Sequence, residues 1–299
     1  MSSSIEQPEV SASSVAPKPR DDQIDAFGLT HRGLVRTENQ DHFILGSLHK
    51  TLRIVATSLP TPELLEMPSE RLAFLGMVAD GVGGATSGEV ASRATLETVA
   101  QFLTNTMQCY YSADPADDQV FIEALRTAAH LSHESVVSRA KQQGARRMAT
   151  TLTLAIGVWP RLYLLHVGDS RCYRLRAGRL EQLTTDQTMA QELLARGALK
   201  PADMARSPFA NVLASAIGSS ADPVVTLHDI QPRDVTMLCT DGLTKHVSLE
   251  RIQQRLSEIP SAEEACRALV DDALQDGGTD NVTVLIARTK VKTPAPSAA

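Results

Sequence analysis

The sequence predicts an α+β fold in which antiparallel β-sheets are covered by helices on their outer faces. Apolar segments of strand length recur along the chain, and helical periodicity is confined to a few segments between runs of strands. Strict alternation of strand and helix would instead indicate a parallel sheet. The chain has 299 residues, 42% of them hydrophobic, which is enough to bury a substantial core.

The N-terminal half is expected to begin with strands and to continue with two helices. Residues 1–22 are rich in Ser, Pro and charged residues, which predicts a disordered tail. Prolines mark residues 49–70 as a surface insertion. Thr86 and Glu89 have the spacing of a capping box and predict the start of a helix. The predicted strands of this half are 25–30, 42–48 and 72–79, and the second helix has an apolar face made of Phe121, Leu125, Ala128 and Leu131.

The C-terminal half returns to strands. Residues 186–219 begin with helical periodicity and are then interrupted by Gly197, Pro201 and Pro208, which predicts a mobile surface segment. Ser261 is predicted to cap the second of two short helices. Residues 23–289 are therefore expected to form one domain, followed by a disordered tail at 290–299. The predicted strands are 151–159, 162–167, 172–175, 224–230, 235–240 and 282–287.

The composition argues against several classes of function. The net charge is −6, whereas a nucleic-acid partner would call for a basic surface. The apolar runs are far shorter than the ~20 residues that cross a bilayer, and the N-terminus lacks a signal-peptide or myristoylation pattern. We therefore expect a cytoplasmic protein without a membrane partner, and a monomer. The four cysteines lack the spacing of a zinc or redox motif and are expected to be reduced.

Five aspartates share one setting, at the ends of predicted strands: Asp41, Asp80, Asp169, Asp241 and Asp280. Strand ends that meet at one edge of a sandwich can aim several carboxylates into one cleft, where they need cations to stay ionised. Oxygen ligands of this kind indicate Mg²⁺ or Mn²⁺. Glycine after Asp80 permits close backbone approach, so the Gly81 carbonyl could also face a metal. Two ions about 3.5–4 Å apart could activate a water for in-line attack on a phosphoryl group.

Each of these aspartates, taken alone, has a plainer interpretation. Asp-Gly after a strand is a common turn signal, and short motifs match by chance. For a single Asp-Gly pair, a simple turn is the better explanation. The combination of several such motifs in one chain reverses that judgement.

Six motifs occur along the chain in a fixed order: 36–41 (RTENQD), 79–84 (ADGVGG), 150–151 (TT), 168–171 (GDSR), 240–244 (TDGLT) and 278–283 (GTDNVT). Together they resemble the metal-dependent protein phosphatases, the type 2C serine/threonine phosphatases, over nearly all of residues 25–288. Val82 stands where eukaryotic members usually have histidine, which is typical of the bacterial branch. The resemblance implies a four-layer α-β-β-α sandwich, in which two antiparallel sheets are flanked by helix pairs and the metals lie at one edge.

The resemblance also implies roles for the metal ligands. Asp80 would bridge the two core metals and take part in catalysis, and the Gly81 carbonyl would contact one of these metals. Asp241 and Asp280 would complete the first metal site. Asp41 would hold the second metal, largely through water.

Further roles follow from the same resemblance. Asp169 would help to bind a third, weaker metal alongside Asp241. Arg36 would clamp the substrate phosphate, a catalytic role suited to its planar donor fork. Residues 186–219 would form a flap beside the cleft, whereas Arg171 could simply form an ion pair near Asp169. The implied enzyme hydrolyses phosphoserine and phosphothreonine on proteins phosphorylated by a Ser/Thr kinase, using a metal-activated water.

Some positions depart from the family pattern. Gln40 replaces a frequent glutamate and removes one water-mediated metal contact. Val82 removes the histidine proposed as general acid, so that protonation must come from elsewhere. His31 could be offered as that acid, but it is better explained as a surface or cleft-wall residue. Lys245 and His246 follow Asp241 where an acidic residue is frequent, and we expect them to alter the charge of the cleft rather than the chemistry.

Two other functions stay open from the sequence. The chain could be a catalytically weak relative that binds phosphoproteins or acts as a scaffold. It could also act on small phosphate esters or be a sporulation-type regulator. Pseudoenzymes usually lose a core aspartate, whereas Asp41, Asp80, Asp241 and Asp280 are all present here.

Overall fold

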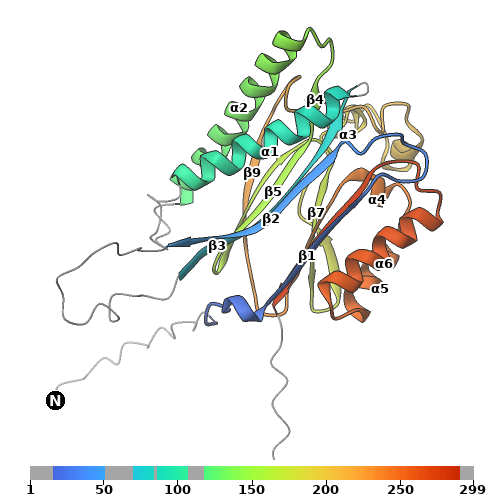
Figure 1. The fold of residues 1–299 in the computed structure, drawn as a ribbon. Coiled ribbons are helices and arrows are strands. Elements are labelled where there is room, and N and C mark those ends of the chain that lie inside the picture. The colour runs from blue at the N-terminus through green and yellow to red at the C-terminus, as the bar shows by residue number, and fades with distance from the viewer. Residues whose placement is uncertain (1–15, 51–69, 84–85, 107–117, 290–299) are drawn as a thin grey trace, which may run out of the picture.

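The computed structural model describes residues 16–50, 70–83, 86–106 and 118–289. Two antiparallel sheets stack face to face, with helices on both outer faces (Figure 1). One sheet has the order β1 (Ile24–His31), β11 (Val282–Thr289), β10 (Val235–Cys239), β7 (Arg171–Arg176), β8 (Arg179–Gln182). The other has the order β2 (Asp41–Lys50), β3 (Glu70–Val82), β5 (Leu152–Val158), β6 (Arg161–Val167), β9 (Val224–Asp229), with β4 (Ala149–Thr150) paired to β3.

The helices form the two outer layers. Helices α1 (Thr86–Thr106) and α2 (Asp118–Gln143) cover the sheet that contains β3, and α5 (Leu249–Glu258) and α6 (Ala262–Gln275) cover the sheet that contains β11. The short α4 (Asp241–Thr244) directly follows β10, and α3 (Met189–Ala195) and the 3-10 turn η5 (Pro201–Arg206) lie in the segment between β8 and β9. The four-layer α-β-β-α sandwich expected from the sequence is therefore confirmed.

The hydrophobic core has three parts, one for each interface between layers. Successive side chains of a strand point to opposite faces, so Met77 packs beneath α1 and α2 while Val78 packs between the sheets. In β10, Met237 likewise packs beneath α5 and α6, while Leu238 packs between the sheets. The layer between the sheets consists of Val78, Ala155, Leu162, Leu164, Cys172, Leu238 and Leu285.

The N-terminal boundary of the ordered domain differs from the one expected. Residues 16–22 were assigned to a disordered tail, yet they lie against the sheets and include part of the turn η1 (Asp21–Gln23). The Trp159 indole donates to the carbonyl of Ala16 over 2.8 Å, and Arg71 donates to Asp21 over 2.6 Å. These partners are distant in sequence, so local composition gives no sign of them. The expected insertion at 49–70 and the tail at 290–299 fall almost wholly outside the described residues.

Helix length and polarity also bear on the membrane expectation. Within the described ranges, no helix is both long and apolar enough to cross a bilayer.

Candidate active site

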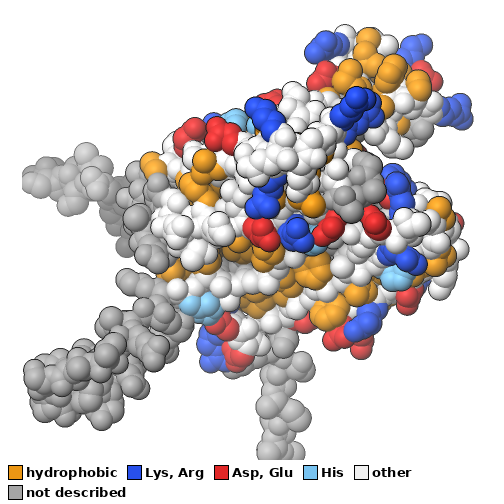
Figure 2. Space-filling model, turned by 45° about the horizontal axis from the view of Figure 1, so that its top comes forward, with side chains coloured by type: hydrophobic (Ala, Val, Ile, Leu, Met, Phe, Trp, Pro, Cys, Tyr) orange, Lys and Arg blue, Asp and Glu red, His pale blue; other side chains and the backbone are white. Residues whose placement is uncertain are grey.

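A cleft of about 1130 Å³ opens at one edge of the sandwich and brings the predicted site residues together. Its lining includes Arg36, Asp80, Gly81, Asp169, Asp241 and Asp280. Asp41 is buried and lies opposite Asp80 in the pairing of β2 with β3. Figure 2, in which the top of the molecule comes forward, shows acidic and basic side chains close together in the middle of this face.

Asp41 is a buried carboxylate held in place by two threonines. Its Oδ2 atom accepts hydrogen bonds from the Thr240 hydroxyl over 2.8 Å and from the Thr283 hydroxyl over 2.7 Å. Burial raises the pKa of Asp41 to about 7, with smaller contributions from the charges of Asp241 and Asp280, although the threonine hydrogen bonds oppose the shift. Thr240 and Thr283 belong to two of the sequence motifs, but only the fold reveals that both point at Asp41.

Asp80 lies beside Asp41, directly opposite it in the pairing of β2 with β3. Burial raises the pKa of Asp80 well above its ordinary value, and the charges of Asp41 and Asp241 raise it further. The backbone N–H of Asp80 donates to the Thr151 hydroxyl over 2.9 Å, and Thr151 also contacts the Ser170 hydroxyl at 2.7 Å. Thr151, which belongs to one of the six sequence motifs, therefore fixes the backbone at Asp80.

Asp169 lies between β6 and β7, at the side of the cluster. Burial raises the pKa of Asp169 to about 7, and the charges of Asp241 and Asp186 add to the shift. Arg171 forms its ion pair with Asp186, with an Nη2 to Oδ2 distance of 2.6 Å. The expected ion pair of Arg171 is thus present, and its partner comes from the start of the 186–219 segment.

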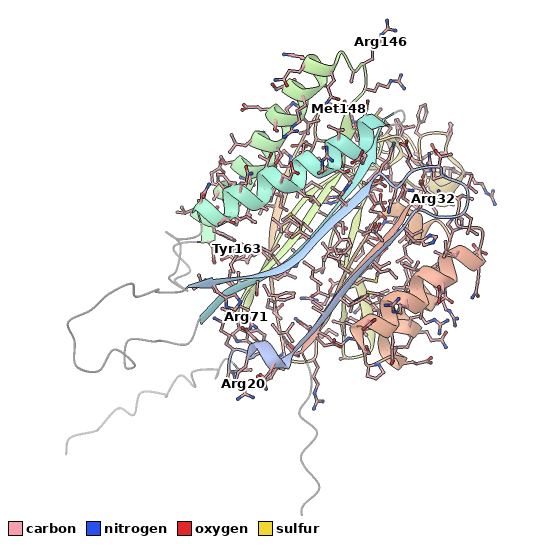
Figure 3. The ribbon with its side chains drawn as sticks, in the orientation of Figure 1. Arg20, Arg32, Arg71, Arg146, Met148 and Tyr163 are labelled. Carbon is pink, nitrogen blue, oxygen red and sulfur yellow. The ribbon has the colours of Figure 1, made fainter. Side chains whose placement is uncertain are left out.

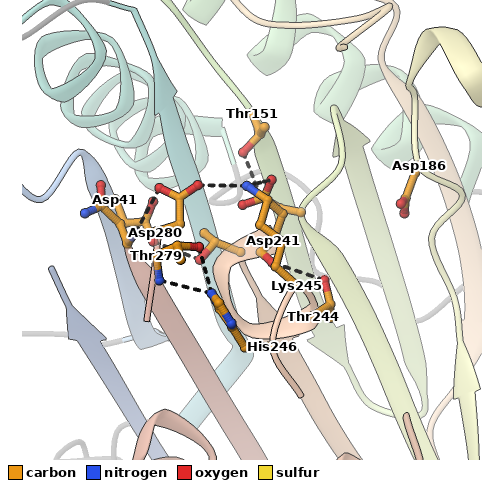
Figure 4. A network of polar contacts seen from close by, with 12 residues as sticks. Asp41, Thr151, Asp186, Asp241, Thr244, Lys245, His246, Thr279 and Asp280 are labelled. Atoms are coloured by element: carbon orange, nitrogen blue, oxygen red, sulfur yellow. Dashed lines mark hydrogen bonds and ion pairs between the residues drawn. The ribbon is translucent and has the colours of Figure 1, made fainter. Parts of the chain in front are cut away.

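Two cations contact the remaining carboxylates, and Figure 4 shows one of them, Lys245, beside Asp241 and Asp280. Lys245 Nζ lies 2.6 Å from Asp241 Oδ2 and 2.7 Å from Asp280 Oδ2. Arg36 holds Asp280 from another side, with Nε 2.8 Å from Oδ1 and Nη2 3.1 Å from Oδ2. Burial raises the pKa of Asp280, but the hydrogen bonds from Lys245 and Arg36 outweigh it and leave the pKa below its ordinary value.

Tight backbone packing explains the glycines beside the aspartates. A Cβ atom on Gly81 would come within 2.3 Å of the Gly88 carbonyl oxygen, and one on Gly242 within 1.9 Å of the Asn281 carbonyl oxygen. Asn281 also accepts a hydrogen bond from the Gln40 backbone N–H over 2.9 Å and donates to the Glu38 carbonyl over 2.9 Å. The Asp-Gly pairs and Asn281 therefore join motifs that are far apart in the chain.

The two histidines considered from the sequence make local contacts. His31 Nδ1 accepts from the Gly33 backbone N–H over 2.9 Å. His246 contacts the Thr279 hydroxyl through Nε2 and the Asp276 carbonyl through Nδ1, both at 2.9 Å. His246 thereby supports the turn that carries Asp280, a structural role that the sequence alone did not indicate.

A comparison with known protein families identifies the family of this chain. The family model for protein phosphatase 2C matches residues 68–276, more than two thirds of the chain. The chain belongs to the protein phosphatase 2C family. The matched range includes Asp80, Asp169 and Asp241, while Arg36, Asp41 and Asp280 lie outside it.

Individual members of the 2C family resemble the chain in sequence and in structure. Serine/threonine protein phosphatase PstP of Mycobacterium tuberculosis is 31% identical over 258 residues, which cover 86% of this chain and 43% of PstP. The chain thus spans less than half the length of PstP. Serine/threonine phosphatase stp of Listeria monocytogenes is 30% identical over 212 residues, covering 70% of this chain and 82% of that protein. The crystal structure of the PstP catalytic domain with two manganese ions has a TM-score of 0.68 and 29% identity, and the match covers 90% of this chain and 99% of that domain.

The donors of this 2C site suit a hard divalent cation. Within the described residues, Asp41 Oδ1 and Asp241 Oδ1 are buried and have no hydrogen-bond partner. Buried unpaired carboxylate oxygens are costly, and a divalent cation would satisfy them. In the same part of the chain, no three His, Cys, Asp or Glu side chains are already arranged as a coordination shell. The chemistry of the donors therefore fits a divalent metal ion.

The cleft walls come from two other parts of the chain. One wall is the segment around Val212, tied to β4 by the backbone pairing of Thr150 with Ile217. The adjoining wall follows the C-terminal end of α2, next to Gly218, and contains the exposed Arg146 and Arg147. Figure 3 shows Arg146 and Met148 at this end of α2, whereas Arg20 and Arg71 lie at the far end of the molecule.

Proposed function

We propose that the chain is a metal-dependent phosphatase that hydrolyses phosphoserine and phosphothreonine on proteins. The observation that carries this proposal is the cluster of buried carboxylates with raised pKa values and unpaired oxygens, in a chain of the 2C family. PstP and stp are named serine/threonine phosphatases, which supports hydrolysis of phosphoserine and phosphothreonine as the reaction. The manganese ions in the PstP structure support Mn²⁺ as the metal. Mg²⁺ is the other candidate because it prefers the same oxygen ligands.

We assign the metal ligands as follows. Asp80 and the Gly81 carbonyl would contact the two core ions, Asp241 and Asp280 would complete the first site, and Asp41 would hold the second. Two metal ions bound in this way would supply an activated water and neutralise the charge of the phosphoryl group. The hydrogen bonds from Thr240 and Thr283 favour ionised Asp41 and so keep it available as a ligand. Asp169, beside Asp241, is the candidate ligand of a third, weaker ion.

Arg36 is the proposed phosphate-binding residue. Its guanidinium is half exposed at the mouth of the cleft and is oriented by two contacts with Asp280. A planar fork held in this way can offer its remaining N–H groups to two phosphate oxygens. The same Asp280 would thus orient Arg36 and contact the first metal, which places the phosphate beside the ions.

The walls of the cleft support a protein substrate. A volume of about 1130 Å³ exceeds what a phosphate group needs and leaves room for flanking residues of a peptide. Arg146 and Arg147 add positive charge on one wall. Because complementary charge favours association, we propose substrates with acidic residues near the phosphorylated position, as produced by a Ser/Thr kinase.

One experiment tests this function and separates it from the alternatives. Hydrolysis of a phosphothreonine peptide and of a chromogenic phosphate ester is measured with Mn²⁺, with chelator, and in the Asp80→Asn variant. We expect turnover of both substrates with Mn²⁺ only, and loss of both in Asp80→Asn. Peptide binding without turnover under any metal would favour the scaffold function. Turnover of the small ester alone would point to a different substrate class, and activity in chelator would refute the metal-dependent mechanism.

A further inference from the structure

Lys245 places a tethered positive charge between two of the proposed metal ligands. Its ammonium nitrogen lies 2.6 Å from Asp241 Oδ2 and 2.7 Å from Asp280 Oδ2 (Figure 4). Helix α4 sets this position, because the Lys245 backbone N–H donates to the Asp241 carbonyl over 2.9 Å and the two residues are one helical turn apart. The Lys245 side chain is 29% exposed, so water screens these contacts only in part.

A divalent cation in the first metal site and this ammonium compete for the same two carboxylates. Asp241 keeps one buried oxygen without a partner in the described structure, and its other oxygen contacts Lys245. Asp280 is shared between Lys245 and Arg36. A metal that binds either Oδ2 atom must displace the ammonium, and a metal on the other oxygens would lie beside it, where like charges in a partly buried site repel.

We propose that Lys245 is a built-in competitor for the first metal site, which weakens Mn²⁺ binding and sets the concentration at which the site fills. This inference rests on the proposed function, because Asp241 and Asp280 are metal ligands only under that proposal. In the chelated protein, Lys245 neutralises two carboxylates that would otherwise repel one another. On metal binding, the side chain swings out toward the open cleft, which it already lines. The protein then exchanges one bound cation for another.

A purely structural ion pair would behave differently. Such a pair stabilises the protein equally with and without metal, and its removal lowers the melting temperature in both states. A competitor stabilises only the metal-free state. Its removal lowers the melting temperature in chelator, increases the rise in melting temperature caused by Mn²⁺, and tightens Mn²⁺ binding.

The test compares the full-length protein with Lys245→Met and Lys245→Gln, which remove the charge, and with Lys245→Arg, which keeps it. Lys141→Met removes an exposed positive charge from α2 and is the matched control. Mn²⁺ affinity is measured by isothermal titration calorimetry, and melting temperatures are measured in chelator and in saturating Mn²⁺. We expect about tenfold tighter Mn²⁺ binding in Lys245→Met and Lys245→Gln, a change that corresponds to about 1.4 kcal/mol. Lys245→Arg and Lys141→Met should stay close to the parent protein.

The outcomes distinguish this inference from the proposed function. Measurable Mn²⁺ binding with an unchanged or weaker affinity in both charge-removing variants would overturn the role of Lys245 alone. Equal losses of melting temperature in chelator and in Mn²⁺ would overturn it as well, in favour of a structural ion pair. An absence of Mn²⁺ binding in the parent protein and in every variant would overturn the proposed function together with the inference.

Discussion

Asp41→Asn should stabilise the metal-free protein while it impairs catalysis. The pKa of Asp41 is about 7 in the fold against an ordinary value of 3.8, a difference of about 3 units. Each unit corresponds to 1.36 kcal/mol, so the buried carboxylate costs up to about 4 kcal/mol at pH 8. This cost is absent below pH 3.8, where the group is neutral in both the folded and unfolded states. It grows as the pH rises to about 7 and then stays constant.

The asparagine variant carries no charge at this position and can still accept hydrogen bonds from Thr240 and Thr283. We expect its free energy of unfolding in chelator at pH 8 to rise by at least about 2 kcal/mol, which raises the melting temperature by roughly 4–8 °C for a domain of this size. Activity with Mn²⁺ should fall by more than about tenfold, because a proposed ligand has lost its charge.

Urea unfolding in chelator, repeated from pH 8 down to pH 4.5, measures the stability change. The advantage of the variant should shrink steadily as the pH is lowered, because the parent protein then becomes neutral at Asp41 too. A variant that is no more stable than the parent at pH 8, or whose advantage is independent of pH, would refute the electrostatic reasoning.

Three further predictions concern the cleft and the opposite sheet. Replacing Arg146 and Arg147 together by Glu should lower kcat/KM about tenfold for an acidic phosphopeptide and leave hydrolysis of a chromogenic ester within about twofold; an equal loss for both substrates would contradict the proposed binding wall. Thr151→Val removes the acceptor of the Asp80 N–H and should cost about 1–3 kcal/mol in urea unfolding, together with a lower kcat; unchanged stability and kcat would exclude a positioning role. Asp272 contacts two arginines of α5 and has a pKa of about 2, so its stabilisation is present above pH 3.8 and is lost as the pH falls from 3.8 to 2. Asp272→Asn should therefore destabilise the protein at pH 7 by about 1 kcal/mol without loss of activity, and an unchanged urea midpoint would count against it.

The sequence predicted the layers well because each layer leaves a periodic pattern. Strand β1, expected at 25–30, runs from Ile24 to His31, and the Ser261 cap forms with the Glu264 backbone N–H over 3.3 Å. Strand β8 escaped prediction because it is largely exposed and carries no apolar alternation. The two-residue β4 was also missed, because its residues Ala149–Thr150 come just before the strand expected at 151–159.

The site could be predicted as a set of residues but not as a network. Ordered motifs identified the aspartates, whereas pairings across the chain depend on the tertiary fold. Arg171 forms its ion pair with Asp186 rather than with a residue next to it in the sequence, and Lys245 contacts Asp280, 35 residues away. The sequence also failed to predict that residues 16–22 pack against the domain, because this packing depends on contacts with the distant Arg71 and Trp159.

The two halves of the cluster come from different sheets. Asp41 and Asp80 belong to the sheet of β2 and β3, while Asp241 and Asp280 adjoin β10 and β11. The sheets meet through an apolar layer that includes Val78, and a sideways slip of one sheet over the other would change every distance between the two pairs of carboxylates. The apolar side chains between the sheets therefore set the spacing of the proposed metal ligands. A substitution among them can alter metal affinity without changing a ligand.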